Sequence, residues 1–270
     1  MTRKPVREDG TVLLRTDYPH HTAIEVAAPR ISEQLGAGQF VSVPAPPGSG
    51  PPGRWMFSPA AVQRDAGNVS SLRLVARAAN RRPDVFGDLR PGDLLPLIGP
   101  LGLPLNLPST DGTTVVVGVD HGAATAGVIA RALRAAGRSC LVHVFVAAPV
   151  DEHAAPWLDP NPDADLQVEA TPQPHRWPGR LAQLVAPAAQ FVIAAPTSVS
   201  RTAFEACRRR GTPCWVLMEP FMACGIGLCL TCAVPVARGG DSYARACTDG
   251  PLFSGDTIAW QQLTPAGRPA

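Results

Sequence analysis

Hydrophobic residues recur at every second position in short stretches of the first hundred residues. In VSSLRLVARA (69–78), leucine and alanine alternate with arginine and valine, a pattern typical of half-buried β-strands. Similar stretches are TVLLRT (11–16), TAIEVAAP (22–29), GQFVSVPA (38–45) and GDLLPLIGP (92–100). No helical pattern separates these strands, so they predict a small β-barrel or sandwich. The Pro- and Gly-rich stretch 44–55 between two of them is expected to be a loop.

The pattern changes at Thr113, where longer apolar runs begin to alternate with helical stretches. The expected strands are 113–119, 140–148, 166–170, 190–196 and 213–218, and the expected helices are 123–137, 179–185 and 198–211. Alternating strands and helices predict a parallel, doubly wound α/β domain with helices on both faces. We therefore expect a β-barrel over 1–107, an α/β domain over 108–218, and a cysteine-rich C-terminal segment over 219–270.

Composition narrows the classes of protein. The 270 residues are 45% hydrophobic, as in a globular protein, and contain no uninterrupted apolar run of membrane-spanning length. The N-terminal MTRKPVREDG is polar and does not resemble a secretory signal, so we expect no membrane association and a cytoplasmic location. The net charge is +2, from 24 basic and 22 acidic side chains mixed along the chain, which argues against a nucleic-acid partner. The one basic run, 208–210, precedes Gly211 and is expected to end a helix.

Four of the seven cysteines lie close together near the C-terminus. Cys224, Cys229 and Cys232 form CxxxxCxxC, and Cys247 follows after fourteen more residues. This is the plant-type spacing of a [2Fe-2S] cluster with a distant fourth ligand. Three thiolates from nine consecutive residues can converge on a cluster only if the backbone curls around it, and glycines at 225 and 227 permit such curling.

Other uses of these thiols fit less well. Structural zinc prefers two CxxC pairs or a CxxC with two histidines, but the segment 222–253 has one CxxC and no histidine. The missing histidines also argue against a Rieske centre, and a reducing compartment argues against disulfides. The remaining cysteines, Cys140, Cys207 and Cys214, fall in apolar strands or a helix and are expected to be buried free thiols.

With these residues in view, the chain resembles a known family. MACGIGLCLTCAVPV followed by ARACTDGPLF is similar to the cluster-binding segment of the electron-transfer subunit of class 1B (NAD⁺) dihydroorotate dehydrogenase. That family is ferredoxin-reductase-like and carries FAD and one [2Fe-2S] cluster. The matching positions outside the cysteines are Glu219, Phe221, Met222, Gly225, Gly227, Asp249, Gly250, Pro251 and Phe253, and GDLLPLIGPLG (92–102) resembles the end of the family's FAD-binding barrel.

The resemblance implies a function in pyrimidine biosynthesis. An FMN-containing dihydroorotate dehydrogenase catalytic subunit would supply electrons, which this chain would pass through the cluster and FAD to NAD⁺ as the electron-transfer subunit of an oxidoreductase. A [2Fe-2S] cluster carries one electron at a time and FAD converts single electrons to hydride pairs. No general acid or base, and hence no catalytic side chain, is expected here.

The same resemblance suggests where FAD would bind. The family's Arg-Pro-apolar-Ser stretch corresponds to Trp55–Ser58, with Phe57 and Ser58 matching, Trp55 in the place of the arginine and Arg54 displaced by one. Either Arg54 still reaches the phosphates or Trp55 stacks in its place. A second contact is expected from the strand residues Arg73, Leu74 and Val75, just before Ala76–Ala79, where the family has Gly-x-Gly-Thr.

The turn expected to contact NAD⁺ also departs from the family. In GVDHGAATAG (118–127), Asp120 and Thr125 occupy the family's glycine and proline positions, and we expect Asp120 to cap the following helix and His121 to be a surface or capping residue. Two alternatives stay open at this point: an iron-sulfur flavoprotein serving another partner or acceptor, and a non-catalytic interaction subunit with structural zinc.

Overall fold

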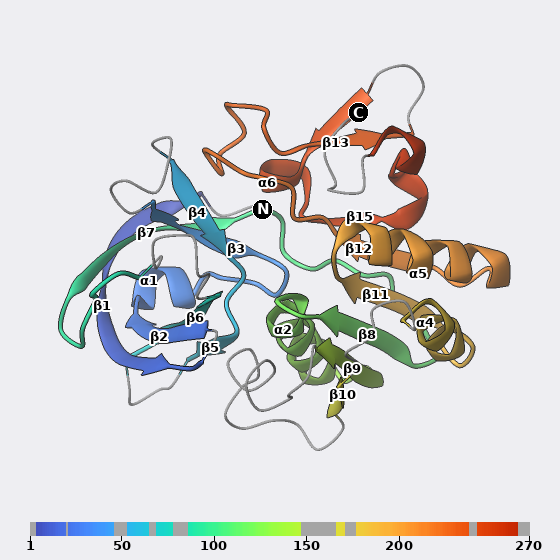
Figure 1. Cartoon of the computed structure of the whole chain (residues 1–270), viewed down its shortest axis with the longest axis horizontal. Helices are drawn as coiled ribbons and strands as arrows, with labels where there is room; N and C mark the ends of the chain where they lie inside the picture. Colours follow the sequence, from blue (N-terminus) through green and yellow to red (C-terminus); the bar gives the residue numbers. More distant parts are fainter. Residues whose placement is uncertain are drawn as a thin grey trace.

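The computed structural model describes residues 4–19, 21–45, 53–64, 69–77, 86–146, 166–170, 177–237 and 242–263. The N-terminal part is a curled, seven-stranded antiparallel sheet in the order β4-β3-β7-β1-β2-β6-β5 (Figure 1). Its elements are β1 (Val6–Asp17), β2 (His21–Ala27), α1 (Pro29–Ser32), β3 (Phe40–Pro44), β4 (Arg54–Phe57), β5 (Ala61–Gln63), β6 (Ser71–Arg77) and β7 (Leu94–Leu101).

This sheet encloses a core of alternate side chains, including Ile24, Leu72, Leu74 and Leu97, each fully buried. The period-2 pattern of the sequence therefore predicted the buried face correctly. The sheet does not close, because β4 and β5 are its two edges, so it is a half-barrel. The expected loop 44–55 was too long: β4 already begins at Arg54 and pairs with β3, with Trp55 opposite Val43.

The second sheet has six strands in the order β10-β9-β8-β11-β12-β15. Five of them are parallel: β8 (Thr114–Val119), β9 (Cys140–Val146), β10 (Leu166–Ala170), β11 (Gln190–Ala194) and β12 (Cys214–Leu217). The central strand β8 is buried throughout because its valines face helices on both sides. The prediction of a doubly wound α/β arrangement is confirmed.

Helices cover both faces of this sheet. α2 (Gly122–Ala135) packs on β8, β9 and β11 with Ile129 and Leu133, whereas α4 (Trp177–Val185) and α5 (Thr197–Arg210) pack together on the other face. α5 ends in the basic run, and Gly211 follows in the left-handed conformation with φ +70°, as the sequence predicted. Cys140, Cys207 and Cys214 are buried as expected.

The C-terminal segment joins the two sheets. After the cysteine loop come β13 (Ala233–Val236), β14 (Ser242–Arg245), α6 (Ala246–Asp249), β15 (Leu252–Ser254), η2 (Gly255–Thr257) and η3 (Trp260–Gln262). β13 and β14 form a hairpin, and β15 extends the second sheet by pairing antiparallel with β12. The residues after 219 are therefore anchored in the α/β sheet.

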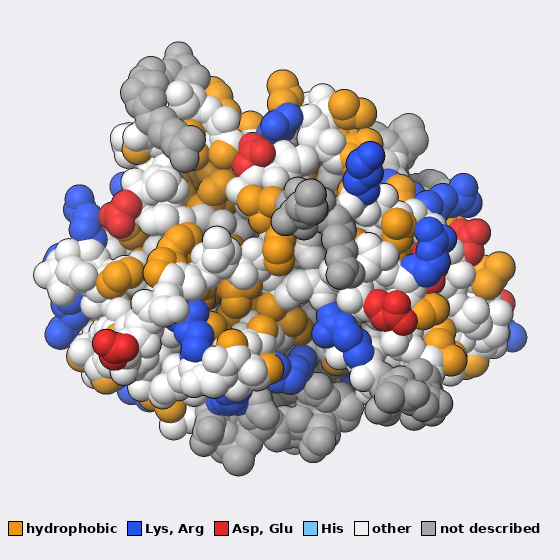
Figure 2. All heavy atoms as spheres, turned by 180° about the vertical axis from the view of Figure 1, so that it is seen from behind, with side chains coloured by type: hydrophobic (Ala, Val, Ile, Leu, Met, Phe, Trp, Pro, Cys, Tyr) orange, Lys and Arg blue, Asp and Glu red, His pale blue; other side chains and the backbone are white. Residues whose placement is uncertain are grey.

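Seen from behind, hydrophobic side chains gather through the middle of the molecule, where the half-barrel meets the rest of the chain (Figure 2). Val75 of β6 and Ala60 belong to the same buried cluster as Ile129 of α2, and Arg131 of α2 donates to the Ala60 carbonyl at 3.1 Å. Among the described residues, no helix is long and apolar enough to cross a membrane.

Two glycines of α2 give a matched test of this packing. A Cβ at Gly122 would lie 1.9 Å from the Ala194 carbonyl oxygen on β11, whereas a Cβ at Gly127 would meet nothing within 4 Å. We expect Gly122→Ala to lower the free energy of unfolding by about 3 kcal/mol through steric overlap. Gly127→Ala should raise it by up to about 1 kcal/mol through helix propensity. Chemical denaturation of the two variants checks this, and equal effects would contradict the packing.

Candidate functional site

The four clustered cysteines form two pairs. The sulfurs of Cys232 and Cys247 lie 3.2 Å apart, and both side chains are 2% exposed. Cys224 lies near enough to Cys229 to contribute to the lowering of its pKa; Cys229 is exposed and Cys224 is partly buried. Cys247 also lies close enough to Cys224 for its thiol to be influenced by the charge there. The two pairs therefore adjoin, with an inner pair in the core and an outer pair near the surface.

The loop curls as the sequence predicted. Gly225 and Gly227 have φ values of +72° and +82°, and Leu230 is also left-handed at +60°. The Thr231 hydroxyl, which sequence reasoning did not single out, accepts from the Ala223 amide at 3.1 Å and contacts the Cys229 sulfur at 3.1 Å. Thr231 thus closes the loop between the second and third cysteines.

The surroundings of Cys229 and Cys247 shift the pKa values of the two thiols in opposite directions. Hydrogen bonds from the Thr231 side chain and backbone lower the pKa of Cys229 to about 6. Burial, followed by the neighbouring Cys232 thiol, raises the pKa of Cys247 to about 12. Cys229 is therefore a thiolate at neutral pH, whereas Cys247 loses its proton only when a metal takes the proton's place.

This arrangement suits a two-iron cluster, because each iron of a [2Fe-2S] centre takes two thiolates. Cys224 and Cys229 would hold one iron, and Cys232 and Cys247 the other. In the described ranges, no group of three or more His, Cys, Asp or Glu side chains is placed to hold a single metal ion. Two adjoining groups of two thiols match the two irons of such a cluster.

Arg245 and Asp249 form hydrogen bonds that hold the cysteine loop at Gly227. Asp249 accepts from the Arg245 amide at 2.8 Å and from its Nε at 3.4 Å, and Arg245 Nη1 donates to the Gly227 carbonyl at 3.4 Å. The pKa of Asp249 is lowered because these bonds and that of Thr248 outweigh its burial. Asp249 was one of the positions that match the family motif, and in the structure it holds Arg245 against the cysteine loop.

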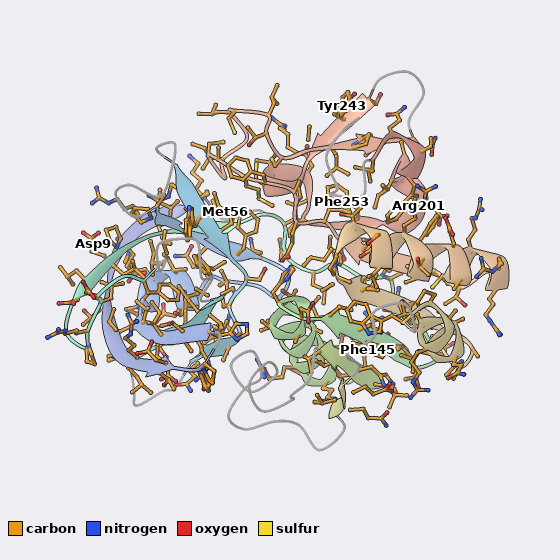
Figure 3. The ribbon with its side chains drawn as sticks, viewed as in Figure 1. Asp9, Met56, Phe145, Arg201, Tyr243 and Phe253 are labelled. Atoms are coloured by element: carbon orange, nitrogen blue, oxygen red, sulfur yellow. The ribbon has the colours of Figure 1, made fainter. Side chains whose placement is uncertain are left out.

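The cluster loop rests on the half-barrel. A Cβ at Gly225 would lie 2.9 Å from Met56 Cε on β4 and 3.1 Å from Leu101 Cδ1 on β7. The Gly102 amide donates to the Cys247 carbonyl at 3.1 Å. Met56 lies on the side of the half-barrel that faces the C-terminal segment (Figure 3).

The residues expected to bind FAD divide between the two faces of β4. Phe57 points into the barrel, where its ring stacks on Phe86 at 5.4 Å, and Trp55 packs against the same core. Arg54 lies on the outer face, donating to the Ser42 hydroxyl and carbonyl at 2.8 Å each. Burial, and then the charge of Arg7, lower the pKa of Arg54.

The other expected FAD contacts, on β6, are also divided. Leu74 is enclosed in the barrel core, and Val75 packs towards α2. Arg73 is 8% exposed, pairs with Glu25 at 3.4 Å and donates to the Tyr18 hydroxyl at 2.9 Å. Leu74 therefore shares the barrel core with Phe57 and Trp55, whereas the contacts of Arg73 and Val75 lie elsewhere. Ala78 and Ala79 lie outside the described residues.

The turn after β8 differs from expectation in one detail. The N-cap of α2 is His121, with no side-chain cap, and Asp120 lies one residue earlier in the left-handed conformation with φ +51°. Capping by Asp120 was therefore a wrong prediction, because Asp120 lies one residue before the N-cap and takes the left-handed conformation of the turn.

His121 takes part in a contact that the sequence did not reveal. Its Nε2 lies 3.0 Å from Glu219 Oε2, and Ser58 Oγ donates to Glu219 Oε1 at 3.3 Å. Partial burial raises the pKa of Glu219, but the hydrogen bond and charge of His121 outweigh it and lower the pKa overall. Glu219 thus links the turn after β8, the segment after β4 and the start of the cluster segment.

Fold and cysteine geometry together define a class: an iron-sulfur protein with a ferredoxin-reductase-like fold. Two solved structures share this fold. One is that of an NADH-dependent reduced ferredoxin-NADP oxidoreductase, at TM-score 0.72 and 22% identity, covering 94% of this chain and 91% of the other. The other is phthalate dioxygenase reductase, at TM-score 0.59 and 15% identity, covering 87% of each chain.

Comparison with known sequences shows which proteins of this fold class the chain is similar to. Residues 219–259 match the family described as the iron-sulfur cluster binding domain of dihydroorotate dehydrogenase B. The chain is 26% identical over 253 residues to the dihydroorotate dehydrogenase B (NAD⁺) electron transfer subunit of Desulforamulus reducens, covering 90% of this chain and 94% of the relative. The Clostridium perfringens subunit of the same name is 23% identical over 82% of this chain and 86% of its own length. The predicted family resemblance is confirmed.

The inner cysteine pair can be tested with a thiol from elsewhere in the chain. Cys232→Ser should abolish stoichiometric iron and acid-labile sulfide, because it removes one of two buried ligands of the inner site. Cys140→Ala, on β9, should leave both contents unchanged. Iron and sulfide analysis of anaerobically purified protein measures this, and full cluster content in Cys232→Ser would contradict the ligand assignment.

Proposed function

We propose that this chain is the electron-transfer subunit of a dihydroorotate dehydrogenase of the NAD⁺ type. It receives single electrons from an FMN-containing catalytic subunit on a [2Fe-2S] cluster held by Cys224, Cys229, Cys232 and Cys247, and passes them through FAD to NAD⁺. The observation that carries the proposal is that four thiols converge, Cys247 from α6 and the other three from a loop that packs directly on β4. The names and coverage of the curated relatives support the same function.

The cluster supplies one-electron redox chemistry, and the chain's own residues fix its place. The outer pair, Cys224 and Cys229, lies towards solvent and the inner pair is buried, so one side of the cluster faces a partner and the other faces the interior. Arg245 is paired with Asp249 and donates to the Gly227 carbonyl, which keeps the loop curled.

An apolar rim surrounds the outer cysteines and suits a protein partner. Phe221, Ile226, Leu228 and Leu230 are 64%, 47%, 78% and 61% exposed, all within ten residues of the chain. Exposed apolar residues gathered in this way mark contact surfaces. Leu230 keeps a left-handed backbone although it is not glycine, a conformation that costs about 1–3 kcal/mol. We assign this rim to docking of the FMN-containing subunit.

For FAD, the outer face of β4 is the favoured site. Arg54, Met56 and Ser58 share this face. Among the described residues, Arg54 donates to the Ser42 hydroxyl and to the carbonyls of Ser42 and Pro96, none of which is acidic. Its guanidinium is thus suited to a phosphate, which makes Arg54 a better candidate than the inward-facing Trp55. Of the remaining expected contacts, Ser58 keeps its place in the proposal, whereas the side chains of Phe57 and Leu74 are enclosed.

NAD⁺ remains the proposed acceptor, following the names of the relatives. The turn after β8 does not fit a pyrophosphate, because Asp120 and the nearby Glu219 place negative charge there. We therefore assign no phosphate contact to this turn.

Cofactor analysis tests the proposal directly. Anaerobically purified protein should contain two irons and two acid-labile sulfides per chain, one flavin, and a rhombic EPR signal after reduction. Co-purification should recover an FMN-containing, dihydroorotate-oxidising partner. Stoichiometric zinc in a colourless, iron-free protein would contradict the proposal, and a cluster with a different redox partner would favour another member of the same fold class.

The apolar rim predicts how strongly single residues affect docking. Leu228→Ser should weaken binding of the catalytic subunit roughly tenfold or more, since burying a leucine contributes about 1.5–3 kcal/mol. Val69→Ser, at another exposed apolar position on the half-barrel, should leave the affinity unchanged. Calorimetric titration of the two variants, with iron content as a control, separates the outcomes, and equal affinities would remove the rim from the interface.

A further inference from the structure

Met56 packs closely between the half-barrel and the cysteine loop. A Cβ built at Gly225 would lie 2.9 Å from its Cε and 3.2 Å from its Sδ, so the thioether packs directly on the backbone that follows Cys224. Gly225 is buried and Met56 half-buried, so much of this contact is shielded from solvent. Leu101 of β7 closes the same contact at 3.1 Å.

A second, independent contact fixes the same two segments side by side. Two residues beyond Met56, the Ser58 hydroxyl donates to Glu219, five residues before Cys224. The outer face of β4 is thus held against the cluster segment at both Gly225 and Glu219. Met56 lies between Arg54 and Ser58 on this face, and Figure 3 places it at the side of the half-barrel towards the C-terminal segment.

The physical properties of the side chain suit a bridging role. Electronic coupling falls steeply with distance and is weaker across a gap or water than across packed atoms. A methionine side chain fills irregular space, and its sulfur is polarisable. Truncating it would leave a gap beside Gly225, because surrounding atoms collapse only partly into such a space.

We propose that Met56 is the positioning residue through which electrons pass from the cluster to the flavin face of β4. The inference deepens the proposed function and rests on it. Each passage moves one electron, oxidises the cluster by one electron and reduces the flavin by one, with no bond made or broken in the chain. Met56 itself undergoes no redox change; it excludes water and keeps the two sites in contact.

The contact itself is tested without any turnover. Gly225→Ala should lower the melting temperature and the iron content, through overlap with Met56 as well as through its left-handed backbone. In a Met56→Ala background the same substitution should cost less, because the two overlapping Met56 atoms are gone and only the contact with Leu101 and the backbone strain remain. Equal costs in both backgrounds would show that the contact is absent and overturn the proposal.

The electronic role is tested by flash reduction. A light-generated one-electron donor reduces the protein, and absorbance follows the passage of the electron between cluster and flavin. We expect Met56→Ala to slow this step at least several-fold with iron and flavin contents unchanged, Met56→Leu to restore most of the rate, and Val69→Ala to have no effect. If Met56→Ala does not fold, Met56→Val, which shortens the side chain less, should slow the step to a smaller extent.

The outcomes separate this inference from the proposed function. Wild-type protein without iron or without flavin would overturn both. Wild-type protein with both cofactors, and a transfer rate that does not respond to Met56, would overturn the role of Met56 and leave the proposed function standing.

Discussion

The structure depends on the close backbone contacts that press the cluster segment against the half-barrel. A Cβ at Gly102 would lie 2.8 Å from Pro251 Cδ and 3.0 Å from the Gly250 carbonyl oxygen, and Gly225 approaches Met56 as closely. The Gly102 and Leu103 amides donate to the carbonyls of Cys247 and Gly250 at 3.1 and 2.6 Å. Larger residues at these glycines would push the segment away, and the fourth cysteine would move with it.

This docking orders the functional parts in space. The apolar rim and Cys229 lie outermost, the inner pair of Cys232 and Cys247 is buried, and Met56 lies between the loop and the outer face of β4. The pairing of β15 with β12 fixes the other end of the segment in the α/β sheet. In the proposed function, a cluster in this position would face the partner on one side and the flavin on the other, with all the alignment supplied by packing.

Local patterns in the sequence predicted much of this architecture. The alternation of apolar and polar residues predicted the buried face of the curled sheet, and the valine-rich runs predicted the parallel strands. Cysteine spacing and glycines predicted a curled loop because they constrain a few consecutive residues. The openness of the half-barrel and the addition of β15 to the second sheet depend on pairing between distant strands, which no local pattern records.

At the site, too, the features that the sequence did not reveal depend on contacts between distant segments. Alignment with a family motif could not tell which face of β4 each side chain takes, so Trp55 and Phe57 were grouped with Arg54 although they point inwards. The His121–Glu219 pair joins residues almost a hundred positions apart. Asp120 was expected to cap α2 from propensity alone, whereas His121 occupies the N-cap and Asp120 lies in the left-handed turn before it.

The central claim is that the cluster stands between the partner and the flavin. Rapid mixing of the anaerobic complex with dihydroorotate, followed at wavelengths that separate the two centres, tests this order of events. The account predicts that the cluster is reduced before the flavin, and that flavin reduction is lost in Cys232→Ser complexes that retain flavin and partner. Flavin reduction at an unchanged rate in those complexes would contradict it.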